Sequence, residues 1–295
     1  MIENVRAGLR SVVAVAVTPF DADGRVDEAA YAAAIERLVH GGITAITPNG
    51  NTGEFYALSD GELSLAVTLT RAAAPDAVII AGVGHEVDRA VRLARDAARQ
   101  GCDGIMIHQP VHPYQSAEGW VAYHQAIAEA VPHTGVVCYV RSPRVTAESL
   151  AELTRRCPNV VGVKYAVPDP VLFATMTTEA DGLVWVCGLA ESWAPFFWPG
   201  GAEGFTSGLA VLAPELSLEL LRLLQAGDRK AALDLWRRLK PIEDLRARDG
   251  SEHNVSVIKE GLAQLGLCSR AVRPPISELA QTDRDQVAAI LKSLG

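Results

Sequence analysis

The stretch VVGVKYA, from Val160 to Ala166, is a run of mostly apolar residues with a lysine inside it. Continuous apolar runs of this length are typical of strands that are buried on both faces, as in a parallel sheet. Seven similar runs occur along the chain. All eight are Val12–Val17, Ile43–Pro48, Val78–Gly82, Gly104–His108, Gly135–Tyr139, Val160–Ala166, Val184–Gly188 and Gly204–Gly208. We therefore predict eight buried strands.

Amphipathic helical segments separate these runs. Asp27–His40 begins with acidic residues and ends in histidine, which suits the helix dipole. Asp88–Gln100 ends before Gly101, a typical helix stop, and Ala147–Arg156 follows Thr146, a typical helix cap. Strands that alternate with such helices predict right-handed βαβ units. Eight units favour a closed (β/α)8 TIM barrel over an open sheet, and 295 residues are enough to form one.

After Pro214 the pattern is purely helical. The predicted helices are Glu215–Ala226, Arg229–Arg248, His253–Leu265 and Arg284–Leu294. One of them closes the barrel. We therefore predict a barrel core of residues 1–214, followed by residues 215–295 as the closing helix and a C-terminal helical cap of the same domain.

Composition excludes several classes of function. The net charge of −8 argues against nucleic-acid binding and against an anionic membrane surface. There is no stretch of about 18 apolar residues that would form a transmembrane helix. The N-terminal MIENVRAGLR lacks the apolar segment of a signal peptide. The five cysteines are scattered and form no CxxC pair, as expected for reduced thiols, so we expect a cytoplasmic protein.

Lysine usage singles out Lys164. Of the five lysines, it alone lies in an apolar strand-like run, and we expect the other four in helical segments compatible with solvent: Lys230, Lys240, Lys259 and Lys292. Burial lowers the pKa of an amine and makes it nucleophilic, as Schiff-base chemistry on a ketone requires. Gly162, on the same strand face, is expected to leave room above the barrel core. The alternative is a lysine that reaches out from the strand end or pairs with an interior acid.

Other strand ends supply polar groups, and active sites of such barrels lie at the C-terminal ends of the strands. Tyr139 could donate and accept the protons of imine formation, although an ordinary strand-end tyrosine would look the same. The turn around Asn51 and Thr52 has exposed amides and a hydroxyl that could hold a carboxylate without a formal charge. Thr206 and Ser207 offer a similar cradle. Both segments would equally serve as simple turns.

Metal and nucleotide chemistry are disfavoured. His108 and His112 flank one strand end but lack the spacing or carboxylate partner of a metal site. No GxGxxG follows a strand, and neither a Walker loop nor a GxSxG elbow is present.

Taken in order, these motifs resemble the dihydrodipicolinate synthase / N-acetylneuraminate lyase superfamily. The resemblance runs from Thr18-Pro19-Phe20 through the GNTGE turn, Tyr139 and Lys164 to Val272-Arg273-Pro274-Pro275. It implies an imine between Lys164 and a 2-keto acid, proton transfer by Tyr139, and carboxylate binding by Asn51 and Thr52 with backbone near Thr206 and Ser207. It also implies a homotetramer or homodimer that needs no metal or organic cofactor.

Departures from the family pattern bear on the substrate. Dihydrodipicolinate synthases typically have Thr-Thr where this chain has Asn51-Thr52, and their second tyrosine falls on His112. Arg144, however, matches the arginine with which these enzymes bind the carboxylate of the aldehyde substrate. Arg141, Gly53-Glu54-Phe55 and the C-terminal pattern resemble 5-dehydro-4-deoxyglucarate dehydratase instead. Candidates for the outer pocket are His112, Arg141, Arg144, Glu191 and Arg246, of which we expect Glu191 and Arg246 to be surface or loop residues.

The sequence thus favours a lysine-imine lyase, an aldolase or dehydratase. The preferred substrate class is a 2-keto-3-deoxy sugar acid such as 5-dehydro-4-deoxyglucarate. Synthesis of 4-hydroxy-tetrahydrodipicolinate from pyruvate and an aldehyde is the alternative. A catalytically inactive, ligand-binding barrel is the rival from another class, and a metal-dependent barrel hydrolase is the remaining one.

Overall fold

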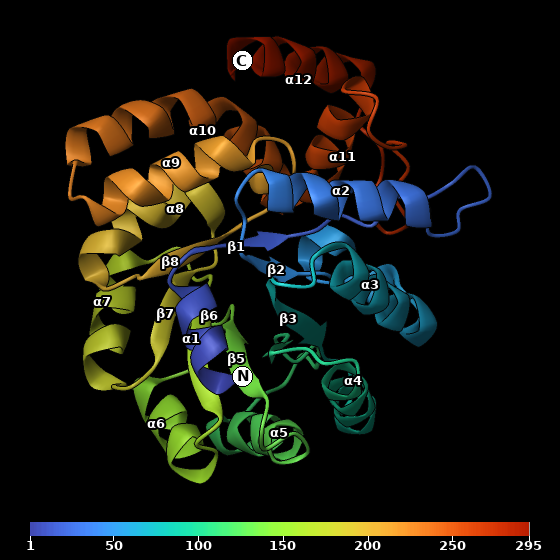
Figure 1. The fold of residues 1–295 in the computed structure, drawn as a ribbon. Helices are drawn as coiled ribbons and strands as arrows, with labels where there is room; N and C mark the ends of the chain where they lie inside the picture. Colours follow the sequence, from blue (N-terminus) through green and yellow to red (C-terminus); the bar gives the residue numbers. More distant parts are fainter. Residues whose placement is uncertain (295) are drawn as a thin grey trace. The chain divides into compact units, whose positions relative to one another are not determined.

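The computed structural model describes residues 1–294 and contains a closed barrel of strands in the order β1 to β8 (Figure 1). The strands are β1 (Val12–Val15), β2 (Ala45–Thr47), β3 (Val78–Val83), β4 (Gly104–Ile107), β5 (Gly135–Val140), β6 (Val160–Tyr165), β7 (Val184–Cys187) and β8 (Gly204–Ser207). Neighbouring strands from β3 to β8 pair in parallel. The predicted TIM barrel is confirmed, and each predicted run contains its strand to within one residue.

The strands are buried along almost their whole length. A helix follows each strand along the chain. These helices are α2 (Glu28–His40), α3 (Asp60–Ala73), α4 (Val87–Arg99), α5 (Ala117–Glu129), α6 (Ala147–Arg156), α7 (Pro170–Glu179), α8 (Ala190–Phe197) and α9 (Pro214–Gln225). Asp27 caps α2 by accepting a hydrogen bond from the backbone of Ala30, so it precedes the helix that it was predicted to begin. Thr146 caps α6 as predicted, by accepting from the backbone of Ser149.

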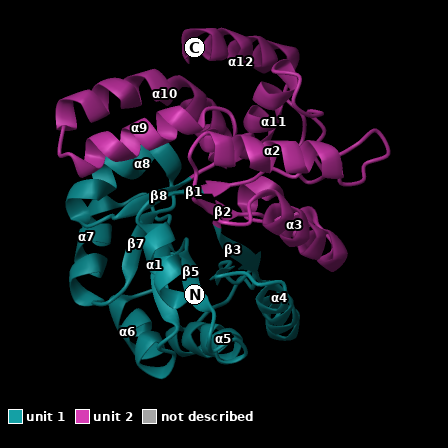
Figure 2. Ribbon diagram, viewed as in Figure 1, with its two compact units in different colours: residues 1–13, 78–206 teal, residues 14–77, 207–295 magenta. Residues whose placement is uncertain are grey.

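The chain forms two compact units (Figure 2). One comprises Met1–Val13 and Val78–Thr206, and the other comprises Ala14–Ala77 and Ser207–Gly295. The first contains most of the barrel strands, and the second contains the C-terminal helices α9, α10 (Arg229–Ser251), α11 (Asn254–Gln264) and α12 (Gln281–Leu294). The division into a barrel of residues 1–214 and a helical addition of residues 215–295 stays a prediction. Within residues 1–294, no helix has the length and apolar character needed to cross a membrane.

The predicted end of the helix that starts at Arg229 coincides with a break in helical geometry. In α10, Arg248, Asp249 and Gly250 depart from helical backbone angles, with φ of 50° at Asp249 and 72° at Gly250. Glycine accepts this left-handed conformation at little cost, whereas it is unfavourable for other residues. The break redirects the chain into α11.

An N-terminal helix, α1 (Ile2–Leu9), was not foreseen from the sequence. It packs against β3, β5, β6 and β7 in the first unit. Several strands have glycine where α1 approaches. A Cβ at Gly162 would lie 2.4 Å from Leu9 Cδ1, and one at Gly104 or Gly135 would lie 2.9 Å from Val5 Cγ2. The expectation that Gly162 makes room above the core for Lys164 was therefore wrong, because its missing side chain is replaced by Leu9.

Gly162→Ala tests this packing. The added methyl group would force Leu9 out of place and would also approach the carbonyl oxygen of Val184, at 3.0 Å. We expect a loss of about 1–3 kcal/mol in the free energy of unfolding, which overpacking typically costs. Denaturant unfolding measures it.

Gly61→Ala is the matched control, because a Cβ at Gly61 in α3 meets nothing within 4 Å. It should leave stability unchanged or slightly raised. In a Leu9→Ala background the further loss caused by Gly162→Ala should be smaller than in the wild type, which a double-mutant cycle measures. A Gly162→Ala protein as stable as the wild type would contradict the proposed packing.

Candidate active site

Lys164 lies in the buried row formed by the carboxyl-terminal halves of β5, β6 and β7. It pairs in register with Tyr139 on one side and Val186 on the other. The side chain is only 4% exposed. Its Nζ lies 4.2 Å from the centre of the Tyr139 ring. The two residues for which the sequence predicted catalytic roles are therefore in direct contact.

Space for the Lys164 side chain comes from Gly188, the residue directly after β7. A Cβ at Gly188 would lie 2.9 Å from Lys164 Cγ and 3.0 Å from Ala166 Cβ. Any larger residue would collide with the lysine stem. Gly188 thus has the role that the sequence had suggested for Gly162.

Tyr139 is itself buried and is contacted from three sides. Besides Lys164, the His108 ring packs edge-on against it with 5.9 Å between ring centres. The Arg141 guanidinium lies 6.0 Å from the ring centre. A cation is attracted to an aromatic face, but only weakly at an exposed position such as that of Arg141. Arg141 is therefore the outer-pocket candidate that the structure brings to Tyr139.

Glu191 is fully buried, which corrects the expectation of a surface or loop residue. It follows β7 at the start of α8, next to Ala190, whose φ of 57° is unusual for a residue with a side chain. Non-glycine residues in this conformation cost energy and cluster at functional sites. Glu191 and Lys164 both influence Cys187, whose pKa burial raises to about 12, with Glu191 raising it further and Lys164 lowering it. Cys187 therefore stays a thiol.

His112 and Arg144 lie on exposed loops. The His112 ring contacts only its own loop in the interactions described, with Nδ1 2.9 Å from the Tyr114 carbonyl oxygen. The backbone N–H of Arg144 donates to Ser142 Oγ at 3.3 Å. The structure does not bring either residue to Lys164, and their roles in substrate binding stay predictions.

The Asn51–Thr52 turn belongs to the second unit. Residues Asn51–Gly53 form a short 3-10 helix, and Glu54 follows with a left-handed φ of 62°. Thr18 Oγ1 donates to the Gly53 carbonyl oxygen at 2.8 Å, and a Cβ at Gly53 would lie 3.0 Å from the Ala16 carbonyl oxygen. The turn is thus packed against the segment after β1, with Thr52 buried and Asn51 partly exposed.

A buried ion pair fixes the end of this turn and corrects the prediction for Lys259. Lys259 was expected on a solvent-compatible helix, but it is fully buried and donates to Glu54 Oε1 at 2.5 Å and to the Ala271 carbonyl oxygen at 2.7 Å. Its Nζ also lies 4.0 Å from the centre of the Phe20 ring. Burial lowers the pKa of Lys259, and Glu54 opposes that shift. The apolar run around Lys259, VSVIK, was the sequence signal for this burial.

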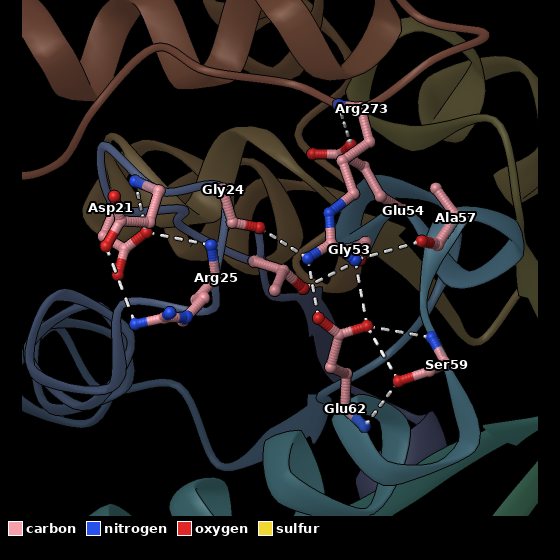
Figure 3. Close-up of polar contacts among 11 residues, drawn as sticks. Asp21, Gly24, Arg25, Gly53, Glu54, Ala57, Ser59, Glu62 and Arg273 are labelled. Atoms are coloured by element: carbon pink, nitrogen blue, oxygen red, sulfur yellow. Dashed lines mark hydrogen bonds and ion pairs between the residues drawn. The ribbon is translucent and has the colours of Figure 1, made fainter.

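Arg273 completes the network around Glu54 (Figure 3). Its backbone N–H donates to Glu54 Oε2 at 2.8 Å. Its guanidinium binds both carboxylate oxygens of Glu62, at 2.6 and 2.9 Å, and donates to the carbonyl oxygens of Gly24 and Ala57. Sequence reasoning assigned Arg273 no role beyond the VRPP resemblance. It connects the chain after α11 to the turn and to the start of α3.

The end of β8, formed by Thr206 and Ser207, is also buried. Ser207 Oγ accepts a hydrogen bond from the backbone of Ala210 at 2.8 Å and lies 3.3 Å from Ser217 Oγ, so its hydroxyl is engaged locally. Thr206 is 7% exposed. Arg246, expected on the surface or a loop, is 4% exposed and pairs with Glu243 at 2.5 Å.

Within residues 1–294, no group of three or more His, Cys, Asp or Glu side chains could hold a metal ion.

Comparison with known proteins gives one family throughout. The model of the dihydrodipicolinate synthetase family matches residues 8–294. A probable 5-dehydro-4-deoxyglucarate dehydratase from Rhizobium rhizogenes is 32% identical over 94% of this chain and 93% of its own length. A 4-hydroxy-tetrahydrodipicolinate synthase from Acidiphilium cryptum is 33% identical over 97% and 98%. The crystal structure of dihydrodipicolinate synthase from Oceanobacillus iheyensis superposes with a TM-score of 0.95, at 35% identity over 100% of this chain and 99% of that one.

Acid should weaken the Arg273 network through Glu62. The hydrogen bonds from Arg273 lower the pKa of Glu62 to about 2, from 4.5. Because the folded pKa is the lower one, this stabilisation is complete above about pH 4.5 and is lost as pH falls towards 2. We expect the stability difference between wild type and Glu62→Gln to shrink over this window, by on the order of 1–3 kcal/mol.

Urea unfolding at a series of pH values measures this difference. Glu219→Gln serves as control, since Glu219 pairs with Arg222 on an exposed helix face and should contribute little at any pH. A difference for Glu62→Gln that stays constant from pH 6 to about pH 2 would show that the Arg273 pair is not the cause.

Proposed function

The chain belongs to the dihydrodipicolinate synthetase family, and from this premise we propose that it is a lyase that forms an imine between Lys164 and a 2-keto acid. The observation that carries the proposal is the burial of the Lys164 amine against the Tyr139 ring, at 4.2 Å from the ring centre. A buried amine loses its proton more readily than an exposed one, and only the unprotonated amine attacks a ketone.

The proposed reaction starts with addition of the Lys164 amine to C2 of the keto acid. Tyr139 donates a proton to the departing hydroxyl of the carbinolamine, so that water leaves and a protonated imine forms. The imine nitrogen then accepts the electron pair released when a proton leaves C3 or when the C3–C4 bond breaks. No external electron acceptor is needed, because the imine itself fills that role.

Carboxylate binding is assigned to the Asn51–Thr52 turn, with Thr206 and Ser207 lining the pocket. The backbone N–H groups and hydroxyls of such turns bind anions without a formal charge. The rigid packing of the turn, with Gly53 held by Thr18 and Glu54 held by Lys259, supports this assignment. A preorganised turn loses little entropy when the carboxylate binds.

Our preferred substrate class is a 2-keto-3-deoxy sugar acid such as 5-dehydro-4-deoxyglucarate, cleaved or dehydrated. Two observations support it: the Arg141 guanidinium lies 6.0 Å from the centre of the Tyr139 ring, and Glu191 is a fully buried carboxyl group, which could move a proton to or from a substrate hydroxyl. The relatives with a dehydratase name point the same way. Condensation of pyruvate with an aldehyde is the second candidate, supported by Arg144 and by the relatives with a synthase name. We propose a homotetramer or homodimer that needs no metal or organic cofactor.

Trapping of the imine tests the nucleophile. Pyruvate followed by borohydride should add one reduced pyruvyl group to the wild-type protein and none to Lys164→Ala, as measured by intact mass. Lys259 is the rival because it is also buried, although its amine is engaged by Glu54 and Ala271. Lys259→Arg should therefore keep the adduct.

Peptide mapping of the trapped protein completes this test, since the label must fall on the Lys164 peptide. Lys230→Ala removes an exposed lysine and is the control for nonspecific labelling, so it should keep the adduct. The proposed function would be wrong if wild-type protein gave no adduct with pyruvate or with any larger 2-keto acid.

Replacement of the proposed proton donor should slow imine formation without abolishing it. Tyr139→Phe keeps the ring that contacts Lys164 but removes the hydroxyl, and we expect a rate about 10²- to 10⁴-fold lower. Tyr165→Phe is the matched control. Tyr165 directly follows Lys164 in β6 and is buried like Tyr139, but its ring packs against Phe173 and Trp185. Single-turnover trapping gives both rates. Equal rates for the two variants would rule out proton transfer by Tyr139.

A further inference from the structure

Arg141 is an exposed arginine whose guanidinium has no carboxylate partner. It directly follows Val140, the last residue of β5, and within residues 1–294 its side chain forms no ion pair or hydrogen bond. The guanidinium lies 6.0 Å from the centre of the Tyr139 ring. Its planar set of donors is therefore available to a carboxylate from outside the chain, next to the proposed proton donor.

Arg141 is also within reach of the proposed nucleophile. Lys164 Nζ lies 4.2 Å from the centre of the same Tyr139 ring, so Nζ and the guanidinium are separated by no more than the sum of the two distances. A six-carbon acid that is bound to Lys164 at C2 has its carbons C3 to C6 to cover such a separation. All three residues belong to the first unit, in or directly after the paired strands β5 and β6. Arg141 can therefore meet a charged group at the far end of the substrate.

Gln109 holds the backbone of Arg141. It directly follows His108, whose backbone N–H donates to the Val83 carbonyl oxygen at 2.8 Å and so extends the pairing of β4 with β3. The Arg141 backbone N–H donates to Gln109 Oε1 at 3.4 Å. Gln109 Nε2 donates in turn to Gln115 Oε1 at 2.8 Å. One side-chain amide thus connects the loop after β4 with the loop after β5.

Both ends of this connection are anchored. Gln115 directly precedes Ser116, which caps α5 by accepting a hydrogen bond from the backbone of Gly119 at 3.0 Å. Pro110 follows Gln109 and restricts it to an extended backbone. The backbone from which the Arg141 side chain projects is therefore fixed before a ligand binds, so that less entropy is lost on binding.

A connection that served stability alone would not need an arginine at position 141. The hydrogen bond to Gln109 uses the backbone N–H, which every residue except proline has. The guanidinium adds no ion pair to the described part of the fold, and its contact with an aromatic ring is weak at an exposed position. The arginine side chain is therefore better explained by a ligand than by the fold.

We propose that Arg141 binds the second carboxylate of a 2-keto diacid, and that Gln109 is the positioning residue that holds Arg141 beside Tyr139. This inference rests on the proposed imine chemistry. It narrows the substrate class from keto acids in general to those with a carboxylate at both ends. It also makes the loops after β4 and β5 the part of the candidate site that determines specificity.

The test compares two six-carbon keto acids that differ at one end. 2-Oxoadipate ends in a carboxylate, whereas 2-oxohexanoate ends in a methyl group. Borohydride trapping over a range of concentrations gives the half-saturating concentration of each. In Arg141→Met the value for 2-oxoadipate should rise about 5- to 50-fold, between the effects of exposed and of well-ordered charged pairs, while the value for 2-oxohexanoate changes little.

Two other arginines of the first unit complete the comparison. Arg95 in α4 is also exposed and forms no ion pair within residues 1–294, so Arg95→Met controls for the loss of one positive charge. It should bind both acids as the wild type does. Arg144, in the same loop as Arg141, is the rival. A selective loss of 2-oxoadipate binding in Arg144→Met but not in Arg141→Met would overturn the inference.

Gln109 is tested through its dependence on Arg141. Gln109→Ala should raise the half-saturating concentration of 2-oxoadipate about 2- to 5-fold, less than Arg141→Met does, because it acts indirectly and through a long hydrogen bond. In an Arg141→Met background the same change should have no further effect. Gln115→Ala should act like Gln109→Ala, whereas Gln115→Glu keeps the acceptor for Gln109 Nε2 and should keep the wild-type value. A merely structural Gln109 would affect both acids alike, in either background.

The outcomes are distinct. Equal effects of Arg141→Met on the two acids, or no effect on either, with adduct still formed on Lys164, would overturn this inference and leave the imine chemistry standing. A selective effect of Arg141→Met that Gln109→Ala does not share would overturn the positioning role of Gln109. Absence of any adduct in the wild-type protein would overturn the imine chemistry, and this inference with it.

Discussion

Parallel pairing of β5, β6 and β7 in one register is the constraint on which the candidate site depends. It sets Tyr139, Lys164 and Val186 side by side. In a parallel sheet, alternate residues face the same side, so a shift by one residue would turn the lysine away from the interior. Gly162 and Gly188 show how closely the surroundings follow this register. One admits Leu9 of α1, and the other admits the stem of Lys164.

The structure contains two buried lysines in different surroundings. Lys259 has a carboxylate partner and a carbonyl acceptor, which together compensate the cost of burying its charge. Lys164 lies against the Tyr139 ring and acts electrostatically on Cys187, whose pKa it lowers. An amine that is stabilised as an ammonium is a poor nucleophile, so the ion pair suits Lys259 to structure. Lys164 stays the proposed nucleophile, which its contact with the Tyr139 ring supports.

The second unit devotes much of its polar network to one turn. Two ion pairs, Lys259–Glu54 and Arg273–Glu62, connect the residues after the turn to α3 and to the chain after α11. The backbone N–H of Arg273 joins the two pairs by donating to Glu54. Each buried donor in this network has a carboxylate or carbonyl acceptor, as buried polar groups require. The result is a turn whose last residues, Gly53 and Glu54, are held by Thr18, Lys259 and Arg273.

Local sequence patterns were sufficient to predict the fold class, the eight strands, most helices and the candidate residues Lys164 and Tyr139, which the structure brings into contact. The signals were apolar runs, helix caps, and one lysine among β-branched residues. Packing between distant segments determined the rest, namely the burial of Lys259, Glu191 and Arg246, the contact of Gly162 with α1, and the role of Gly188. Burial of a charge depends on a partner far away in sequence, as Glu54 is for Lys259. No local pattern specifies which distant residue will neutralise a charge or fill a gap.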